Sequence, residues 1–445
     1  MKIILSTYAF YPYASGGTEV YTLSMAEYLV SHGHQVLIAA GWNGEPAAGE
    51  EQVWNDEEIK AGLYLYRGLQ VLGIHLKQQT VESVYSNEKQ PWLPAYTQIF
   101  TQLNWSDAAL LVMNGVSAVS GLSLCKALQQ MHPAIRLSVI VHTPFVCAKA
   151  DMLFAGTGRR CQQTITPATC AACVTAAGTG LPFALSKIAN SVANSGIFSA
   201  VSRSAFFSQH KLLQLKIKGL QWLNAKADRW IVFSNDMKLF LEKQPFIDID
   251  KVRVIRHGID KANFYPPLVK PPLAPAVFLY AGRFETIKGI DLLCEAWKKL
   301  PEDAGLRKLC LAGNWDQTAA GRQVHAALAA RRDVEFIPSL PQHELADFYR
   351  RVHCVIIPSR WVETGPLVMH EAIACGCDVI SSNLGGQAEL AALYAGKSHV
   401  FNLQQEDSLY RLLLNYQAAD SVPVPMPWSA AEHFDAVTEA MAIAG

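Results

Sequence analysis

The chain reads Pro358-Ser359-Arg360-Trp361-Val362-Glu363-Thr364-Gly365-Pro366-Leu367-Val368-Met369-His370-Glu371-Ala372 directly after the apolar run Val355-Ile356-Ile357. The apolar run predicts a buried strand, the Gly-Pro pair predicts a turn, and the residues that follow predict a helix. The free N–H groups at the start of such a helix suit an anionic or polyhydroxyl ligand. Glu363 and Glu371 would frame that ligand with two carboxylates, which accept hydrogen bonds from neighbouring hydroxyls. The alternative is an ordinary strand–turn–helix with solvated acids.

The alternation of short apolar runs with amphipathic segments extends along the whole chain. This rhythm is typical of βα units built around a parallel sheet. We therefore predict an α/β fold of two doubly wound Rossmann-like domains that face each other across a cleft. The expected strands cover residues 3–5, 35–40, 109–113, 137–141, 229–233, 252–255, 277–280, 308–312, 334–337, 355–357 and 378–381, and the clearest helices cover 19–31, 289–300 and 428–444.

A proline-rich segment divides the chain, because so much proline excludes a helix or the interior of a sheet. With 445 residues the chain is also too long for one hydrophobic core. We expect a first domain over 1–266, a linker over 267–275, a second domain over 276–427 and a terminal helix over 428–445 that ends the second domain or crosses back to the first.

Composition excludes several classes of partner. The formal net charge is zero, so the chain has no global basic field to attract nucleic acid. No apolar stretch is long enough to cross a bilayer, and the N-terminal apolar run is too short for a signal peptide. We therefore expect a cytoplasmic protein whose ten cysteines are reduced thiols or metal ligands rather than disulfides.

Two loops carry candidate ligand-binding residues at the ends of predicted strands. Gly16 and Gly17 would allow the backbone to approach a ligand closely at the start of a helix. This turn lacks the G-x-G-x-x-G pattern, which argues against a dinucleotide redox cofactor. Arg283 and Lys288 flank a second loop, where a planar fork and a point charge together would neutralise a diphosphate without a metal ion.

With these motifs in order, the chain resembles the retaining glycosyltransferases of family 4, which have the GT-B fold. The E-x7-E element formed by Glu363 and Glu371 carries most of the resemblance. The other matching segments are Gly16-Gly17, residues 254–260, Gly282-Arg283, Lys288-Gly289, Ala312-Gly313 and residues 384–390.

The resemblance implies that the protein moves a sugar from a nucleotide-diphosphate sugar to an acceptor hydroxyl of a glycan, a lipid-linked molecule or a small molecule. The acceptor would bind the first domain and the donor the second, and no metal cofactor would be required. The implied catalytic residues are Glu363, His142, Arg283 and Lys288. The implied donor-binding residues are Gly16, Gly17, Arg283, Lys288, Glu363, Thr364, Gly365, Pro366, Leu367 and Glu371, with Glu363 at the sugar and Glu371 at the ribose.

One departure from the family pattern affects the expected donor site. Pro366 occupies a position whose backbone could otherwise donate to the sugar, and proline has no N–H. We expect this difference to alter which sugar is accepted. The alternative functions are another GT-B enzyme, such as an epimerase or a phosphorylase, and a sugar-binding subunit without catalytic activity.

Two further features lie outside these motifs. A loop-rich insertion at about 145–190 contains four cysteines, for which a structural zinc site, free thiols and a disulfide are the three interpretations. Some family members are similar there. The basic amphipathic stretch 211–223 would either pack on the core or touch an anionic membrane that carries a lipid-linked acceptor, and we favour packing. The four cysteines are Cys147, Cys161, Cys170 and Cys173.

Overall fold

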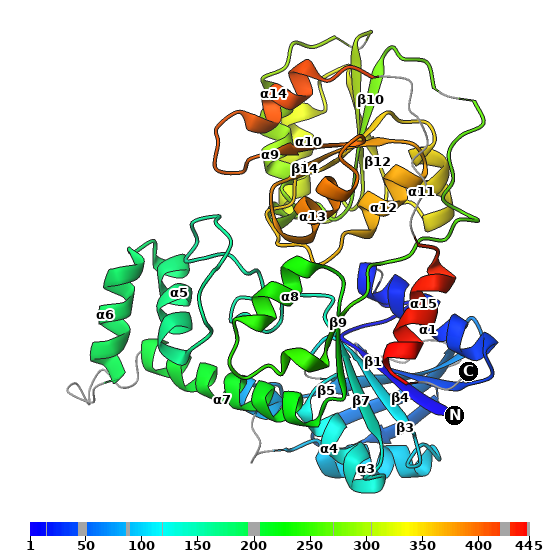
Figure 1. The fold of residues 1–445 in the computed structure, drawn as a ribbon, viewed down its shortest axis with the longest axis vertical. Helices are drawn as coiled ribbons and strands as arrows, with labels where there is room; N and C mark the ends of the chain where they lie inside the picture. The colour runs from blue at the N-terminus through cyan, green and yellow to red at the C-terminus, as the bar shows by residue number, and fades with distance from the viewer. Residues whose placement is uncertain are drawn as a thin grey trace.

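The computed structural model contains two α/β domains, which confirms the predicted fold class (Figure 1). Each domain is built on a largely parallel sheet covered by helices on both faces. The structure describes residues 1–14, 16–42, 51–85, 90–117, 119–194, 205–269, 271–303, 305–418 and 428–442. Within these residues no helix is both long and apolar enough to cross a membrane.

The first sheet has nine strands in the order β3-β4-β5-β2-β1-β6-β7-β8-β9 over the described residues. All neighbours are parallel except β3 with β4 and β4 with β5, which are antiparallel. The strands are β1 Lys2–Thr7, β2 Gln35–Gly41, β3 Glu51–Asn55, β4 Ile59–Tyr66, β5 Leu69–Leu76, β6 Leu110–Asn114, β7 Arg136–Ile140, β8 Arg229–Val232 and β9 Val252–Val254.

The strands β3, β4 and β5 were not predicted from the sequence, because the predicted βα units contain only parallel strands. Arg67 and Gly68 link β4 to β5 as a two-residue turn, and both have positive φ values of 51° and 80°. Such turns match the twist of an antiparallel hairpin, because both central residues adopt left-handed backbone conformations. The hairpin extends the edge of the first sheet beyond β2, where β5 lies parallel to β2.

The second sheet has six parallel strands in the order β12-β11-β10-β13-β14-β15 over the described residues. Numbered within the domain this order is 3-2-1-4-5-6, the doubly wound arrangement in which the strand order reverses between β10 and β13. The strands are β10 Ala276–Ala281, β11 Arg307–Ala312, β12 Val334–Ile337, β13 Cys354–Ile357, β14 Asp378–Ser382 and β15 Ser398–Phe401.

Helices cover both faces of each sheet, and apolar side chains fill the layers between them. Each sheet therefore separates two hydrophobic clusters. The helices of the first domain are α1 Gly17–Ser31, α2 Val81–Tyr85, α3 Leu93–Gln102, α4 Leu122–Met131, α5 Pro167–Thr179, α6 Phe183–Asn194, α7 Ala205–Lys226 and α8 Asn235–Glu242, followed by the 3-10 turn Ile249–Lys251. The later helices are the 3-10 turn Thr286–Lys288, α9 Ile290–Lys298, α10 Ala319–Leu328, α11 Gln342–Tyr349, α12 Leu367–Ala374, α13 Gly385–Leu393, α14 Ser408–Asn415 and α15 Ala430–Ala440.

The C-terminal helix α15 lies on the first domain, beside α1 (Figure 1). Phe434 and Val437 of α15 belong to the hydrophobic cluster on one face of the first sheet. Arg136 of β7 donates a hydrogen bond from Nη1 to the carbonyl oxygen of Met441 (2.9 Å). The end of the chain therefore ties the second domain back onto the first.

Helices α5, α6 and α7 project from the body of the first domain as an arm (Figure 1). The stretch 211–223 lies in α7, and its Leu213, Leu220 and Leu223 are buried. Lys216 of α7 is also turned inward and donates from Nζ to the carbonyl oxygen of Cys147 (2.9 Å). The apolar face of α7 is therefore used for packing.

Candidate functional site

The candidate site lies at the point where the strand order of the second sheet reverses. β10 and β13 are neighbours there, and Arg283 follows the first while Glu363 follows the second. In open α/β sheets, ligands bind beyond the carboxyl ends of the strands at this point, because the loops of the two strands diverge and leave a crevice. Strand order thus brings together two motifs that are far apart in sequence.

The loop after β10 is held tightly against the end of β13. Gly289 has a φ of +74°, and a Cβ atom at this position would lie 1.8 Å from the carbonyl oxygen of Pro358. At the other end of the loop, the Phe284 N–H donates to Asn314 Oδ1 (2.9 Å). Only glycine permits such a close approach with a left-handed backbone. This contact places Lys288 next to the segment that carries Glu363.

Lys288 and Glu363 form an ion pair in this structure, with 2.7 Å between Nζ and Oε1. Ser359 donates from Oγ to the same carboxylate oxygen (3.1 Å). The side chains of Lys288 and Glu363 are 26% and 18% exposed, so both are held in place yet reachable from the solvent. Two of the four residues expected to be catalytic are therefore in direct contact.

Arg283 has an exposed side chain, which forms an ion pair with Glu285 across the same loop (3.1 Å). Its charge also affects the pKa of a residue in the first domain. Burial raises the pKa of Glu19, and the positive charge of Arg283 opposes that rise. Glu19 lies in the first turn of α1, so the charge of Arg283 acts across the two domains on the helix that follows the Gly16-Gly17 loop.

The segment between Glu363 and α12 is enclosed by both domains. The Thr364 hydroxyl donates to the carbonyl oxygen of His142 in the first domain (2.9 Å). A Cβ atom on Gly365 would lie 2.9 Å from Phe233 and 3.1 Å from His257. Glycine is therefore needed at 365 for the two domains to meet here.

α12 begins at Leu367, and no side chain caps its N-terminus at Pro366. α1 likewise begins after Gly16 without a side-chain cap. By contrast, hydroxyl side chains cap α8, α10 and α15. The starts of α3, α4, α9, α11, α13 and α14 also lack a side-chain cap, so a missing cap does not by itself mark a ligand site.

Glu371 lies in the second turn of α12 and is buried. The hydroxyl of Tyr349 donates to its Oε2 (3.2 Å). Burial, followed by the charge of Glu371, raises the pKa of Tyr349 well above its usual value. The phenol therefore stays protonated and holds the carboxylate in one orientation.

His142 follows β7 and stays neutral at physiological pH, because burial lowers its pKa to about 3. Its Nε2 lies 3.3 Å from Asn114 Oδ1. Since the Asn114 amide nitrogen donates to Thr22, Oδ1 acts as the acceptor and the proton belongs on Nε2. His142 is thus positioned as a neutral polar group, which makes it unsuited to act as a cationic acid.

Glu389 of α13 makes the main polar bridge between the domains. Its carboxylate accepts hydrogen bonds from Arg256 (2.6 Å), the side chain of Asn235 (3.1 Å) and the backbone of Asp236 (3.0 Å). These contacts hold α13 against α8 and fix the two halves of the crevice relative to each other.

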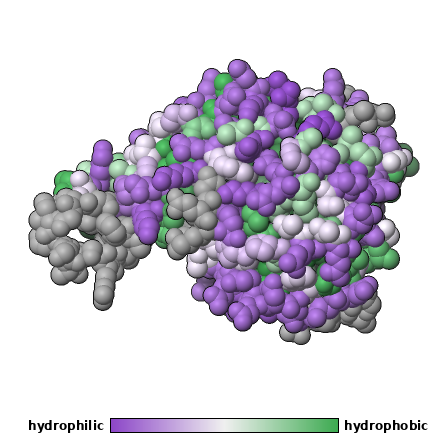
Figure 2. All heavy atoms as spheres, turned by 90° about the horizontal axis from the view of Figure 1, so that it is seen from below, coloured by the Kyte–Doolittle hydropathy of each residue, from purple (hydrophilic) through white to green (hydrophobic). Residues whose placement is uncertain are grey.

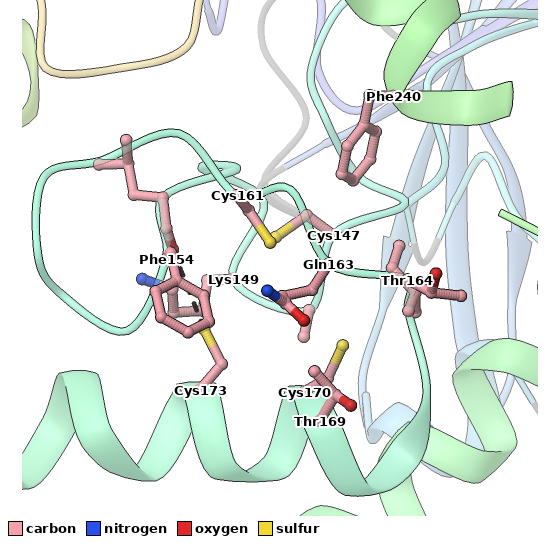
Figure 3. Close-up of a pocket in the computed structure, with 13 residues that line it drawn as sticks. Cys147, Lys149, Phe154, Cys161, Gln163, Thr164, Thr169, Cys170, Cys173 and Phe240 are labelled. Carbon is pink, nitrogen blue, oxygen red and sulfur yellow. Dashed lines mark hydrogen bonds between the residues drawn. The ribbon is translucent and has the colours of Figure 1, made fainter. Parts of the chain in front are cut away.

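The four cysteines of the insertion line a single pocket, away from this crevice (Figure 3). Cys170 and Cys173, from α5, point toward the loop that carries Cys147 and Cys161. Burial raises the pKa of the Cys170 thiol to about 12, and it also raises those of Cys161 and Cys173. All four are free thiols. Over the residues that the structure describes, no three His, Cys, Asp or Glu side chains are arranged to hold a metal ion.

Several residues at the site were missed from the sequence. Ser359 lies within the quoted motif, and its position four residues before Glu363 was the available signal. Glu19 lies two residues after the glycine pair, separated from it by Thr18. Tyr349 gave no signal, because it lies 22 residues before Glu371 in an unremarkable helix.

A group of buried histidines surrounds Tyr21 where α15 rejoins the first domain. His257 stacks on Phe233 with 3.7 Å between ring centroids. His433 lies 2.7 Å from the carbonyl oxygen of Arg256 and 3.1 Å from the Tyr21 hydroxyl. Burial lowers the pKa of His433 to about 4 and that of His257 well below its usual value. Both rings are therefore neutral at physiological pH.

These histidines predict acid sensitivity. Below their unfolded-state pKa of about 6.5, the unfolded chain binds protons that the folded chain excludes. The contribution of these histidines to the free energy of unfolding should therefore be fully present above about pH 6.5. It should be lost as the pH drops toward 4, by roughly 1.4 kcal/mol per pH unit for each fully buried histidine. Urea unfolding at several pH values measures this slope. His433→Gln should reduce the slope by about one proton, and an unchanged slope would contradict the account.

Comparison with known proteins agrees with this geometry. The fold is that of the GT-B glycosyltransferases. Residues 269–420 match the family model described as Glycosyl transferases group 1. HepE from Anabaena, solved in complex with UDP and glucose, superposes with a TM-score of 0.61 at 14% identity, covering all of both chains. Sucrose-phosphate synthase from Thermosynechococcus elongatus superposes with a TM-score of 0.57 at 17% identity, over 99% of this chain and 96% of that one.

Curated relatives match a shorter part of the chain. A D-inositol 3-phosphate glycosyltransferase of Xylanimonas cellulosilytica is 29% identical over 189 residues, which are 39% of this chain and 45% of the relative. A glycogen synthase of Mycobacterium tuberculosis is 30% identical over 171 residues, which are 38% of this chain and 40% of the relative. The chain thus spans less than half the length of these two relatives.

Proposed function

We propose that this protein is a retaining glycosyltransferase, which moves a sugar from a nucleotide-diphosphate sugar to an acceptor hydroxyl. The observation that carries the proposal is the contact between Lys288 and Glu363 at the reversal point of the second sheet, with Arg283 beside it. A cation that neutralises phosphate and a carboxylate that accepts from sugar hydroxyls are there held 2.7 Å apart.

The diphosphate of the donor would lie between Arg283, Lys288 and the Gly16-Gly17 loop. As the glycosidic bond breaks, negative charge develops on the leaving diphosphate. Two preorganised cations and the free N–H groups at the start of α1 would stabilise that charge. This arrangement supplies the role that a divalent cation has in other transferases, so catalysis would be independent of a metal ion.

The sugar and the ribose would contact α12 and the residues before it. Glu363 and the backbone of Thr364, Gly365 and Leu367 would hold the sugar hydroxyls, while Pro366 has no N–H to offer. The buried carboxylate of Glu371 would accept from the ribose hydroxyls. When the donor binds, Glu363 must exchange part of its bond with Lys288 for bonds to the sugar, which frees the lysine for phosphate.

Retention of configuration would follow from attack on the face that the diphosphate leaves. The departing phosphate oxygen can accept the proton of the attacking hydroxyl on that face, so no protein nucleophile is needed. The neutral ring of His142 would bind near the reacting sugar without adding positive charge beside the cationic anomeric centre.

A thermal-shift screen tests the proposal directly. Full-length protein would be heated with UDP, GDP, ADP and their sugars, because a ligand that binds the folded state raises the unfolding temperature by mass action. We expect one nucleoside diphosphate to shift the transition more than its monophosphate. A screen in which no diphosphate shifts the transition would oppose the proposal.

The two glutamates should differ in their effects. Glu371→Gln keeps the shape of the side chain but removes the charged acceptor, so nucleotide affinity should fall roughly tenfold. Glu363→Gln should leave nucleotide affinity nearly unchanged and slow transfer roughly a hundredfold. Calorimetric titration and release of the nucleoside diphosphate measure the two effects. Equal loss of nucleotide affinity in both variants would contradict this division of roles.

An epimerase, a phosphorylase and a silent sugar-binding subunit remain the alternative functions. A phosphorylase would need inorganic phosphate as co-substrate, and an epimerase would convert the donor without any acceptor. A silent subunit would bind the nucleotide sugar without releasing nucleoside diphosphate. Assays of product with and without an acceptor and phosphate separate these outcomes.

We also infer that the thiol pocket binds a structural zinc ion. Its four cysteines come from a loop and one helix, and Cys170 and Cys173 share a face of α5. The loop contains Ala150, Met152 and Ala155 with φ values between 48° and 57°, a strained backbone that needs a fixed environment. Zinc binding would require rotation of the thiol side chains and would lower their raised pKa values.

Metal analysis of purified protein should find about one zinc per chain. Cys170→Ser should lower the zinc content and the stability of the first domain, since it removes one ligand. Cys294→Ser is the matched control, because Cys294 lies in α9 of the second domain. Protein without zinc, with four titratable thiols in the insertion, would contradict this inference.

A further inference from the structure

A second reversal of strand order lies in the first sheet, between β1 and β6. Asn114 is the last residue of β6, and its neighbours in the sheet are Thr7 of β1 and Ile140 of β7. Asn114 is only 3% exposed. Its buried amide therefore lies at the point of the first sheet that corresponds to the β10/β13 junction of the second, where open α/β sheets bind their ligands.

A single hydroxyl proton fixes the orientation of this amide. Thr22 of α1 is fully buried and donates from Oγ1 to the carbonyl oxygen of Thr18, one helical turn earlier (2.8 Å). Because a hydroxyl has one proton, the same oxygen accepts from Asn114 Nδ2 (2.9 Å). Asn114 Oδ1 is thereby left to accept from His142 Nε2 (3.3 Å). A chain of hydrogen bonds thus joins the first turn of α1 to the ring of His142.

The other ring nitrogen of His142 is left as an acceptor. With the proton on Nε2, Nδ1 carries a lone pair, and no protein group among the described residues donates to it. The ring packs on Tyr21 and Phe233, with 4.6 and 5.0 Å between ring centroids. The titratable groups around it are Tyr21 of α1, His257 after β9 and His433 of α15. All three are neutral, because burial raises the pKa of the phenol and lowers those of the two imidazoles.

The alternative is that the Asn114 amide only satisfies buried polar atoms. Asn190 of α6 is an example of that role, because its amide donates to the Thr175 hydroxyl of α5 (3.2 Å) and to a carbonyl oxygen of its own helix. The chain through Asn114 ends differently. One end is the helix that follows the Gly16-Gly17 loop, and the other is His142, whose carbonyl oxygen accepts from Thr364 of the second domain (2.9 Å).

We propose that Asn114 is a positioning residue for sugar transfer, which holds His142 so that Nδ1 accepts a hydrogen bond from a substrate hydroxyl. The proposal rests on the proposed function, because that function supplies the hydroxyl. Asn114 acts through the ring and does not itself touch the substrate. Through Thr22 it also ties the ring to the start of α1, so the group at the sugar and the helix at the diphosphate keep a fixed separation.

The ring nitrogens of His142 test the first part of the proposal without any substrate. Protein labelled with 15N-histidine should show His142 by NMR as the Nε2–H tautomer, identified as the signal that His142→Gln removes. Thr22→Val takes away the acceptor of the Asn114 amide, which can then turn over and donate to Nε2, so both tautomers should appear. Thr22→Ser keeps the hydroxyl and should match the wild type.

Thr175→Val is the matched control, because Thr175 is also a buried helical threonine that accepts from a buried asparagine. It lies in the arm of α5, α6 and α7, which Figure 2 shows extending from one side of the molecule. The signals of His142 should be unchanged in this variant.

Asn114→Asp tests the second part. A carboxylate beside Nε2 should raise the pKa of His142, so that Nδ1 carries a proton at low pH and cannot accept. The kcat for transfer should be roughly tenfold lower below the raised pKa and recover as the pH rises above it, while the KM for the donor changes less. The wild type should lack this limb of its pH profile, since burial keeps the pKa of His142 at about 3.

The Nδ1–H tautomer in the wild-type protein would overturn the proposal, and this reading needs no variant to fold. A lower kcat in Asn114→Asp with an unchanged pH profile would show a structural role alone and would also overturn it. Both outcomes leave the proposed function intact. Wild-type protein that has the Nε2–H tautomer but transfers no sugar would instead contradict the proposed function, and the substrate hydroxyl with it.

Discussion

Lys288→Met is expected to lower the rate of sugar transfer by roughly 10²–10³-fold and to weaken nucleoside diphosphate binding. The substitution keeps the length of the side chain but removes the charge that would neutralise the leaving diphosphate. It also leaves the partly buried carboxylate of Glu363 without its cation, since the two groups lie 2.7 Å apart. Release of nucleoside diphosphate and calorimetric titration measure the two effects.

Lys298→Met is the control for this prediction. Lys298 belongs to α9 of the same domain, is 46% exposed and pairs with Glu295 three residues before it. Exposed pairs of this kind contribute little to stability, so the variant should behave like the wild type. Transfer by Lys288→Met at the wild-type rate would contradict the assignment of Lys288 to the diphosphate.

Gly289→Ala is expected to destabilise the second domain by about 4 kcal/mol or to prevent its folding. The added methyl group would meet the carbonyl oxygen of Pro358 at 1.8 Å, in a backbone conformation with φ +74° that alanine disfavours. Relief of the clash would move the loop after β10 away from β13 and separate Lys288 from Glu363. Thermal unfolding and the soluble yield of the variant measure this effect.

Gly396→Ala is the matched control in the same domain. No atom lies within 4 Å of a Cβ built at Gly396, and its φ is outside the left-handed range. We expect its stability to stay within about 0.5 kcal/mol of the wild type. Equal stability of the two alanine variants would show that the close approach at Gly289 is not required.

The α/β class could be predicted because buried parallel strands appear in the sequence as short apolar runs, such as residues 355–357. The antiparallel strands β3 to β5 could not be read in the same way. Their apolar and polar residues alternate only in part. The hairpin turn also depends on the positive φ of Arg67, and an arginine in a sequence does not predict such a backbone conformation.

The candidate site could be predicted as a set of residues but not as a set of contacts. The resemblance placed Lys288 and Glu363 on one donor, yet their ion pair depends on β10 and β13 being neighbours in the sheet. The bond from Thr364 to His142 joins residues 222 apart across two domains. Strand order and domain packing are long-range properties, so local sequence patterns do not specify such pairs.

Helix α6 illustrates a different limit, because its Leu185 and Ile188 are 53% and 61% exposed while its Ser186 and Asn190 are buried. Its sequence shows a helix with one apolar side, and the natural expectation is that this side is buried. The buried Asn190, which donates to α5, reverses that expectation. A sequence pattern fixes which residues share a face, whereas the contacts of the neighbouring helices decide which face points inward.

Calorimetric titration of the full-length chain with nucleoside diphosphates tests the central claim most directly. The account predicts that one diphosphate binds at about one site per chain, more tightly than its monophosphate, and that Lys288→Met and Glu371→Gln both weaken it by roughly tenfold or more. Absence of binding by any nucleoside diphosphate, or equal binding by the wild type and Lys288→Met, would contradict the donor site proposed at the junction of β10 and β13.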